Sequence, residues 1–327
     1  MFRVRNHSEM ITQIRCAIYY LLLITNTLMY NVLGEIMYWL YIANLPIKYE
    51  NIRYYCAYGY LSILKLTGIR IYQSGEPIRH GRSLWISNHR SKLDGIIIQT
   101  LLCVSGNDTI SVVKDSIRQI PIFGSFGTHC RCLFIRRDKT AAAKILEAGG
   151  RLSRANNWSV LIFPEGTTMS PYSQGLSHMF SEERSIDKFE RVLFPKTTGF
   201  NLMKQEFETV GNITISYGNP SFKGNEEHSF PALFRIFPHE VYIHIKYVDT
   251  NVDLMDVFRE KDLMLEKAPV KRSANNYRYS CLALLVNMFG HMAFLYCLYA
   301  SNYFRYLIMA ITIFACVRTI IQYEIKS

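Results

Sequence analysis

Apolar residues are distributed in three ways along the chain: a long run near the beginning, short alternating segments in the middle, and a long run near the end. In the middle, residues 48–278, short apolar segments typical of buried strands alternate with amphipathic segments typical of helices. The predicted strands are Leu84–Ser87, Thr109–Val113, Cys132–Ile135, Ser159–Phe163, Arg191–Phe194, Ile213–Tyr217 and Val241–Val248, and the clearest amphipathic helix is Thr140–Ala155. This alternation predicts one α/β domain with a mixed, largely parallel sheet.

The first long run predicts a membrane segment over residues 1–47. Cys16 to Gly34 contains no charged residue, and the apolar character resumes after Glu35 and continues to Ile47. The whole run is longer than the ~20 residues that one span needs and shorter than two spans. A tilted span and a re-entrant pair of helices both fit, and a buried core helix is a further alternative. A cleaved signal peptide is disfavoured because the run is long and no clear cleavage site follows.

The second long run predicts a transmembrane region over residues 279–327. Tyr279 to Phe304 has no Asp, Glu, Lys or Arg, and a shorter apolar stretch, Tyr306 to Val317, follows Arg305. We expect one span and a shorter partner that is interfacial or forms a hairpin with it. Because both ends of the chain favour lipid, we expect an integral membrane protein.

The net charge of +11 fits nucleic acid, anionic lipid or a phosphorylated ligand. No zinc-finger spacing and no glycine-aromatic RNA-binding signature is present, so we do not expect nucleic acid as a partner. The eight cysteines are scattered, and Cys130-x-Cys132 is not a CxxC pair. They indicate free thiols in a domain that faces a reducing compartment.

His89 and Asp94 are the strongest candidates for chemistry. They stand in Asn88-His-Arg-Ser-Lys-Leu-Asp94, between the predicted strand Leu84–Ser87 and a segment that can continue as a helix. On one regular helix, residues five apart lie about 140° apart and cannot meet. If His89 is in the turn and Asp94 in the first helical turn, the carboxylate can hold one ring nitrogen. The other nitrogen is then free to act as a general base.

The spacing His-x4-Asp occurs a second time, at His244 and Asp249. That pair lies in the predicted strand Val241–Val248 and at its end, where an odd separation directs the side chains to opposite faces. We therefore expect His244 and Asp249 to have a structural role, and the spacing alone does not identify a catalytic pair.

Three further blocks follow His89 and Asp94 in order. Leu133-Phe-Ile-Arg-Arg137 is an apolar strand that ends in two arginines, whose guanidinium groups suit phosphate. Phe163-Pro-Glu-Gly-Thr-Thr168 ends a buried strand in a turn that can expose N–H groups and a hydroxyl to an anion. Leu193-Phe-Pro-Lys-Thr-Thr-Gly-Phe200 is the last block. Each block alone is also consistent with an ordinary turn or a solvated edge.

Together, in this order, the four blocks resemble the glycerolipid acyltransferase family, with its NHxxxxD block, a strand ending in Arg, an FPEGT block and a later Pro-containing block. The resemblance covers roughly residues 80 to 250. Phe163–Thr168 and Val192–Phe200 are most similar to the branch that includes lysocardiolipin acyltransferase and its lysophosphatidylinositol- and lysophosphatidate-using relatives. Arg136 is a departure, because many relatives have Asp before the motif arginine.

The resemblance implies transfer of a fatty acyl group from acyl-CoA to the free hydroxyl of a lysophospholipid. His89 would be the general base, Asp94 would fix its tautomer, and the lipid oxygen would attack the thioester directly. Residues expected to bind the acceptor are Arg137, Glu165, Gly166 and Thr167, with Arg90, Lys114 and Pro195 as further candidates. No metal or cofactor is implied, since acyl-CoA is a co-substrate.

The implied substrates also bear on location. Acyl-CoA arrives from the cytosol, so we expect residues 48–278 to face that side of an endoplasmic reticulum membrane. Because Lys48 and Arg53 make the second flank of the N-terminal segment basic too, the re-entrant pair is favoured over a single span. The acceptor lipid and the oligomeric state stay open.

Two other classes of function stay open beside the acyltransferase. One is a non-catalytic membrane protein that uses the same fold to bind lipid. The other is a hydrolase with Ser87 or Ser91 as nucleophile, which is disfavoured because neither serine lies in a G-x-S-x-G elbow.

Overall fold

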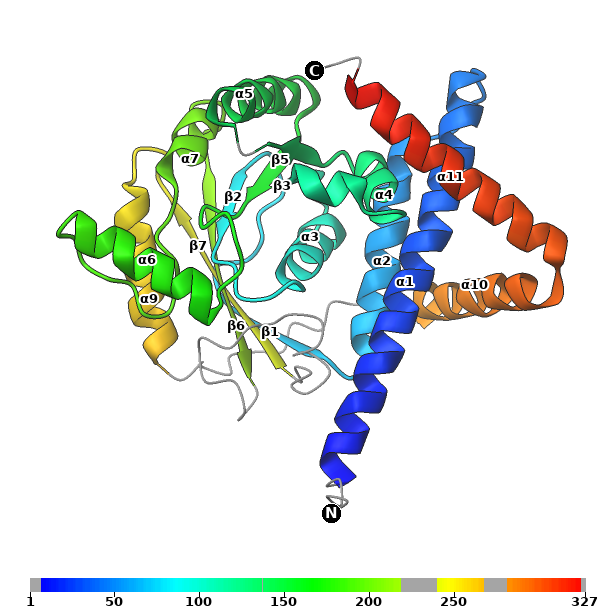
Figure 1. Cartoon of the computed structure of the whole chain (residues 1–327), viewed down its shortest axis with the longest axis horizontal. Coiled ribbons are helices and arrows are strands. Elements are labelled where there is room, and N and C mark those ends of the chain that lie inside the picture. Colours follow the sequence, from blue (N-terminus) through cyan, green and yellow to red (C-terminus); the bar gives the residue numbers. More distant parts are fainter. Residues whose placement is uncertain (1–6, 137, 219–239, 268–280, 325–327) are drawn as a thin grey trace.

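A computed structural model of the whole chain describes residues 7–136, 138–218, 240–267 and 281–324 (Figure 1). Within these ranges a seven-stranded sheet runs in the order β1-β7-β6-β2-β5-β3-β4. The strands are β1 (Arg70–Gly75), β2 (Leu84–Ser87), β3 (Thr109–Lys114), β4 (Leu133–Ile135), β5 (Ser159–Ile162), β6 (Val210–Gly218) and β7 (Glu240–Val248). Neighbouring strands are parallel except β6 and β7. The predicted mixed, largely parallel sheet is confirmed.

The central strands are buried on both faces, because helices cover the sheet on each side. Trp85 of β2 points into the cluster that contains α2 (Ile52–Leu66) and α3 (Asp94–Val104). Its neighbours Leu84 and Ile86 point into the opposite cluster. That second cluster contains side chains from the helices α5 (Lys139–Asn156), α7 (Thr197–Lys204) and α9 (Leu254–Glu266).

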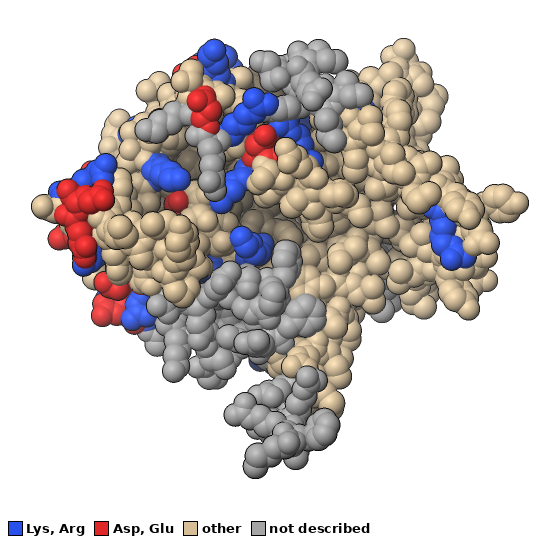
Figure 2. Space-filling model, viewed as in Figure 1, with Lys and Arg blue, Asp and Glu red and all other residues tan. Residues whose placement is uncertain are grey.

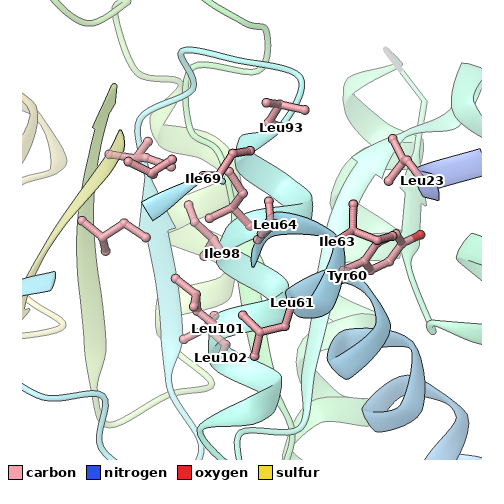
Figure 3. Close-up of a cluster of buried hydrophobic side chains, with 14 of the residues drawn as sticks. Leu23, Tyr60, Leu61, Ile63, Leu64, Ile69, Leu93, Ile98, Leu101 and Leu102 are labelled. Carbon is pink, nitrogen blue, oxygen red and sulfur yellow. The ribbon is translucent and has the colours of Figure 1, made fainter. Parts of the chain in front are cut away.

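The first cluster joins the N-terminal helix to the α/β domain. Figure 3 shows Leu23 of α1 (His7–Ile42) beside Tyr60 and Ile63 of α2, while Leu64 of α2 lies near Ile98 of α3. The inner face of α1 is therefore part of the same apolar core as the sheet. The remaining helical elements are η1 (Tyr49–Asn51), η2 (Asp115–Gln119), α4 (Phe123–His129), α6 (Pro171–Glu183), α10 (Cys281–Ala300) and α11 (Asn302–Glu324).

The predicted strand Arg191–Phe194 is wrong, since this segment has no regular structure. Its backbone N–H groups bond to side chains instead of a neighbouring strand. The N–H groups of residues 190, 191 and 192 all donate to the carboxylate of Asp262 on α9, and Phe194 N–H donates to Ser177 Oγ at 2.9 Å. Its apolar side chains, which suggested a strand, are buried against the second cluster.

The N-terminal run forms one continuous helix rather than the two-helix motif that we favoured. Helix α1 extends through Glu35 to Ile42, and the Glu35 carboxylate is buried and paired with Arg318. The helix ends before Asn44, which has a positive φ of 59°, and Pro46. Helix α2 packs beside α1 and begins at Ile52, beyond residue 47, where the predicted membrane segment ends (Figure 1).

Within residues 281–324 the C-terminal run forms two helices, α10 and α11, and the break between them lies at Ser301 rather than at Arg305. The chain bends by 110° at Ser301, between α10 and α11. Ser301 Oγ accepts the N–H of Phe304 at 3.1 Å and thereby caps the start of α11. Among the described residues, the segment Met10–Ile42 is long and apolar enough to cross a membrane, and the bent pair is a second candidate if it counts as one span.

Candidate active site

His89 lies in the loop that follows β2, at the carboxyl end of the central parallel strands. The preceding residue fixes this loop to the sheet. The side-chain amide of Asn88 donates to Ile215 O at 3.0 Å and accepts from Ile215 N–H at 2.9 Å. Asn88 thus continues the β2–β6 ladder with its side chain, and the backbone turns away at His89.

His89 and Asp94 meet because His89 is in the turn and Asp94 is in the first helical turn, the arrangement that the contact requires. Asp94 is the first residue of α3, and its Oδ2 lies 2.9 Å from His89 Nδ1. The same Oδ2 accepts the backbone N–H groups of Arg90 at 2.6 Å and Ser91 at 2.8 Å. A carboxylate that accepts from these donors requires Nδ1 to carry the ring proton. Nε2 is then the free acceptor, and the side chain of His89 remains 22% exposed.

A third side chain completes this arrangement from another strand. The hydroxyl of Tyr217, on β6, donates to Asp94 Oδ1. Both Asp94 and Tyr217 are buried. One carboxylate oxygen of Asp94 therefore accepts hydrogen bonds from His89 and its loop, and the other accepts a hydrogen bond from a residue of the sheet.

The His89 ring also rests on an aromatic surface. It stacks on Phe163, with ring centroids 4.4 Å apart and an interplanar angle of 30°. The carbonyl of His89 accepts the N–H of Met169 at 2.7 Å. The segment that follows β5 therefore contacts both the imidazole ring and the backbone of His89.

Glu165 is buried rather than open to a ligand, with 3% of its surface exposed. Its Oε1 accepts the backbone N–H of His89 at 3.2 Å, and its Oε2 has no hydrogen-bond partner among the described residues. Burial raises the pKa of Glu165 well above its usual value, against the opposing effects of the His89 N–H and the charge of Arg90. The structure thus places Glu165 against the His89 backbone.

Two buried cations accompany Glu165. Arg90, 7% exposed, donates from Nη1 to Arg191 O at 2.8 Å, and burial lowers its pKa against the opposing charges of Glu165 and Asp94. Lys261 of α9, 1% exposed, donates to Ile213 O of β6. Burial lowers the pKa of Lys261 to about 7, although the charge of Glu165 opposes this shift. Arg90 therefore supports the loop that carries His89. The sequence patterns did not identify Lys261.

The Phe163–Thr168 and Leu193–Phe200 blocks are adjacent. Lys196 N–H donates to Pro164 O at 2.8 Å. Gly166 is exposed with a positive φ of 69°, and a Cβ at this position would lie 3.0 Å from Lys196 Nζ. The Lys196 side chain therefore lies over Gly166. Of the other predicted residues here, Thr167 is half-buried and Pro195 is buried.

Besides Lys261, the sequence patterns did not identify Lys196 and Tyr217 at this site. Lys196 lies inside the block Leu193–Phe200, and a cation close to a glycine turn is a usable signal for an anion site. Tyr217 gave no such signal, because a tyrosine in a strand is ordinary and only the pairing of β2 with β6 brings it to Asp94.

Lys114 and Arg136 lie at the edge of the sheet formed by β3 and β4. Lys114 is exposed at the end of β3 and pairs in register with Ile135. Arg136, the next residue, lies 3.7 Å from the carboxylate of Asp115. The predicted phosphate ligand Arg137 lies outside the described residues.

On one face of the molecule the charged residues are unevenly distributed. Figure 2 shows Lys and Arg gathered on the α/β domain, around a hollow in this face, whereas the part with α1, α10 and α11 is nearly free of charge. A basic surface attracts anionic ligands, and an uncharged helical surface suits lipid.

The geometry can be compared with known proteins. Residues 69–215 match the family model described as Acyltransferase. This match begins just before β1 and ends at residue 215 within β6, and it includes His89, Asp94 and Glu165.

Two curated relatives agree with that match. Lysocardiolipin acyltransferase 1 of Danio rerio is 27% identical over 200 residues, 57% of this chain and 50% of the relative. The probable 1-acyl-sn-glycerol-3-phosphate acyltransferase 5 of Arabidopsis thaliana is 27% identical over 254 residues, 68% of this chain and 66% of the relative. The chain spans about half the length of the first of these.

The crystal structure of the 1-acyl-sn-glycerophosphate (LPA) acyltransferase PlsC from Thermotoga maritima has a similar fold. It aligns with a TM-score of 0.52 at 17% identity, covering 77% of this chain and 92% of that one. At this identity the likeness concerns the fold alone.

Proposed function

We propose that the chain is an acyltransferase that transfers a fatty acyl group from acyl-CoA to the free hydroxyl of a lysophospholipid, and the family match and the relatives support this. The observation that carries the proposal is the pairing of His89 Nδ1 with the buried carboxylate of Asp94, which leaves Nε2 free to accept a proton. The relatives named above act on lysocardiolipin and 1-acylglycerol-3-phosphate, according to their names.

In this mechanism, His89 Nε2 takes the proton of the acceptor hydroxyl as its oxygen attacks the thioester carbonyl. Asp94 holds the ring in the reactive tautomer and stabilises the imidazolium that forms. The proton then reaches the thiolate of the leaving CoA. General-base catalysis is typically worth 10² to 10⁴-fold, and positioning of the two substrates contributes a comparable factor.

The acceptor phosphate would bind at the turn beside His89. Support comes from Gly166, which is exposed with left-handed backbone, and from the Lys196 ammonium that lies over it. Thr167 offers a hydroxyl next to them, Lys114 at the end of β3 is a further candidate, and Arg137 is a candidate from the sequence alone. Glu165 and Arg90 are buried, so their part is to support the His89 loop.

A lysophospholipid acceptor agrees with the apolar helices, and we propose that they bind an endoplasmic reticulum bilayer with the α/β domain in the cytosol. Helix α1 carries exposed apolar side chains along its length, among them Ile11, Ile14, Ile18 and Leu21. Exposed tyrosines flank the bend at Ser301: Tyr296, Tyr299, Tyr303 and Tyr306. Tyrosines favour the membrane–water interface.

The test is CoA release from oleoyl-CoA in membranes that hold the protein, with lysophosphatidate, lysophosphatidylinositol, lysophosphatidylglycerol and monolysocardiolipin as acceptors. We expect His89→Ala to lower turnover at least about 100-fold, and Asp94→Asn to lower it strongly, without loss of folded protein. His244→Ala is the matched control, because His244 bonds to Ser74 on β1 at 3.0 Å and not to the site.

Near wild-type turnover by His89→Ala at equal expression would overturn the proposed mechanism. The alternative function, lipid binding without catalysis, predicts that the wild type retains lysolipid vesicles but releases no CoA with any acceptor. The four acceptors also decide which lysophospholipid is preferred.

A further inference from the structure

Tyr217 contacts Asp94 on the side away from His89, and the mechanism assigns the proton transfer to these two residues. Its hydroxyl donates to Asp94 Oδ1, whereas the other carboxylate oxygen serves His89 and two backbone N–H groups. A buried carboxylate with both oxygens bonded has one orientation. Without the Tyr217 hydroxyl, the buried Oδ1 of Asp94 would lose this hydrogen bond.

The position of the hydroxyl is set by the sheet. Ile215, two residues before Tyr217, is bonded on both its N–H and C=O by the Asn88 side chain. The ladder with β7 fixes the other edge of β6, where Tyr217 pairs with Val241. Tyr217 therefore reaches Asp94 from a strand that is tied to the His89 loop itself.

The hydroxyl stays a donor at working pH, because burial and the neighbouring Asp94 charge raise the pKa of Tyr217 well above its usual value. A hydrogen bond to a carboxylate withdraws negative charge from it. The carboxylate then stabilises the imidazolium less than it would without this bond.

We propose that Tyr217 is a positioning residue for the acyl transfer proposed above, orienting Asp94 and limiting the basicity of His89. The inference rests on that proposed function. The charged and titratable groups around the unit are Arg90 in its loop, Glu165 after β5, Arg191 before α7, Lys261 on α9 and Tyr19 on α1. All of these are retained in the variants below.

The experiment measures kcat/KM for acyl transfer from pH 5.5 to 9 in wild type and Tyr217→Phe. Removal of the hydroxyl makes Asp94 a stronger partner for the imidazolium, so the acid limb of the profile moves to higher pH. We expect a shift of about half to one pH unit, which corresponds to roughly a 3- to 10-fold loss of kcat/KM on the acid limb. The KM for the lysolipid should stay unchanged.

Tyr242→Phe is the matched control. Tyr242 is a buried tyrosine of the same sheet whose hydroxyl donates to a carboxylate, Glu240, at 2.5 Å, but on β7 away from His89. A purely structural contribution of Tyr217 would scale the profile by one factor at every pH. An acid limb that stays in place in Tyr217→Phe would overturn the inference.

A second replacement covers the case in which Tyr217→Phe does not fold. Difluorotyrosine at position 217 keeps the hydroxyl and makes it a stronger donor, so the acid limb should move to lower pH. An unshifted profile there would count against the inference as well. If the wild type transfers no acyl group to any acceptor, the proposed function itself has failed.

Discussion

At the scale of single residues, the centre of the sheet depends on Gly211. Gly211 on β6 pairs in register with Trp85 on β2, which is fully buried. A Cβ added to Gly211 would lie 2.2 Å from the indole ring. Trp85 has no room to move, because it packs between strands and the α2–α3 layer. The absence of a side chain at position 211 is therefore a packing requirement.

Gly211→Ala should destabilise the protein by about 1–3 kcal/mol, through overpacking against Trp85. Chemical unfolding in detergent, followed by Trp fluorescence, measures this. Gly175→Ala is the control, since Gly175 is in helix α6 and a Cβ there meets nothing within 4 Å. That change should be neutral or stabilise by up to about 1 kcal/mol. Equal effects of the two substitutions would contradict the packing argument.

At the scale of elements, helix α9 organises the segment before α7. Asp262 receives the N–H groups of residues 190 to 192, and the carbonyl of Arg191 in turn receives Arg90. One residue earlier on the same helix, Lys261 bonds to the β6 backbone. A helix on the outer face of the sheet is thus connected to the His89 loop.

Asp262→Ala should cost about 2 kcal/mol of stability, because it leaves three N–H groups without their charged acceptor. It should also lower acyl transfer by loosening the support of Arg90. Asp256→Ala on the same helix is the control: Asp256 is exposed and pairs with Arg259, and such pairs contribute little. Thermal unfolding and CoA release compare the two variants, and an Asp262→Ala protein as stable as the control would refute this role.

At the scale of the whole molecule, a buried charge cluster joins the C-terminal helix to the rest. Arg318 of α11 pairs with Glu35 of α1, and His129 of α4 lies 3.2 Å from the same Glu35 oxygen. The Arg318 guanidinium also lies over the Tyr38 ring, 4.4 Å from its centroid. The two terminal helices and the α/β domain therefore meet at one carboxylate.

Arg318→Ala should destabilise the protein by about 3–5 kcal/mol, because the buried carboxylate of Glu35 loses its strongest partner. Combining it with Glu35→Gln should recover much of that loss. Arg305→Ala is the control, since Arg305 is an exposed residue of the same helix. Unfolding temperatures in one detergent compare the variants, and no recovery in the double variant would speak against a charge effect.

The membrane segments show where linear patterns are insufficient. Apolar runs located both terminal helical regions, but the runs did not show where helices break. Glu35 interrupts the apolar run without ending α1, because Arg318, which is 283 residues away, neutralises it. Ser301 lies inside an uncharged run and yet separates two helices by capping the second. The association with a bilayer stays a prediction.

The sequence by itself determined the α/β class, most strands, and the meeting of His89 with Asp94, because these follow from periodicity and from contacts five residues apart. Only the tertiary structure decided the contacts of Tyr217, Lys261 and Asp262. Each of these residues contacts a partner on another strand or in another layer. The pairing of the strands, or the packing of a helix on the sheet, brings the two partners within hydrogen-bond distance. Local patterns carry no information about such pairings, which is why the support of the site was invisible until the chain was folded.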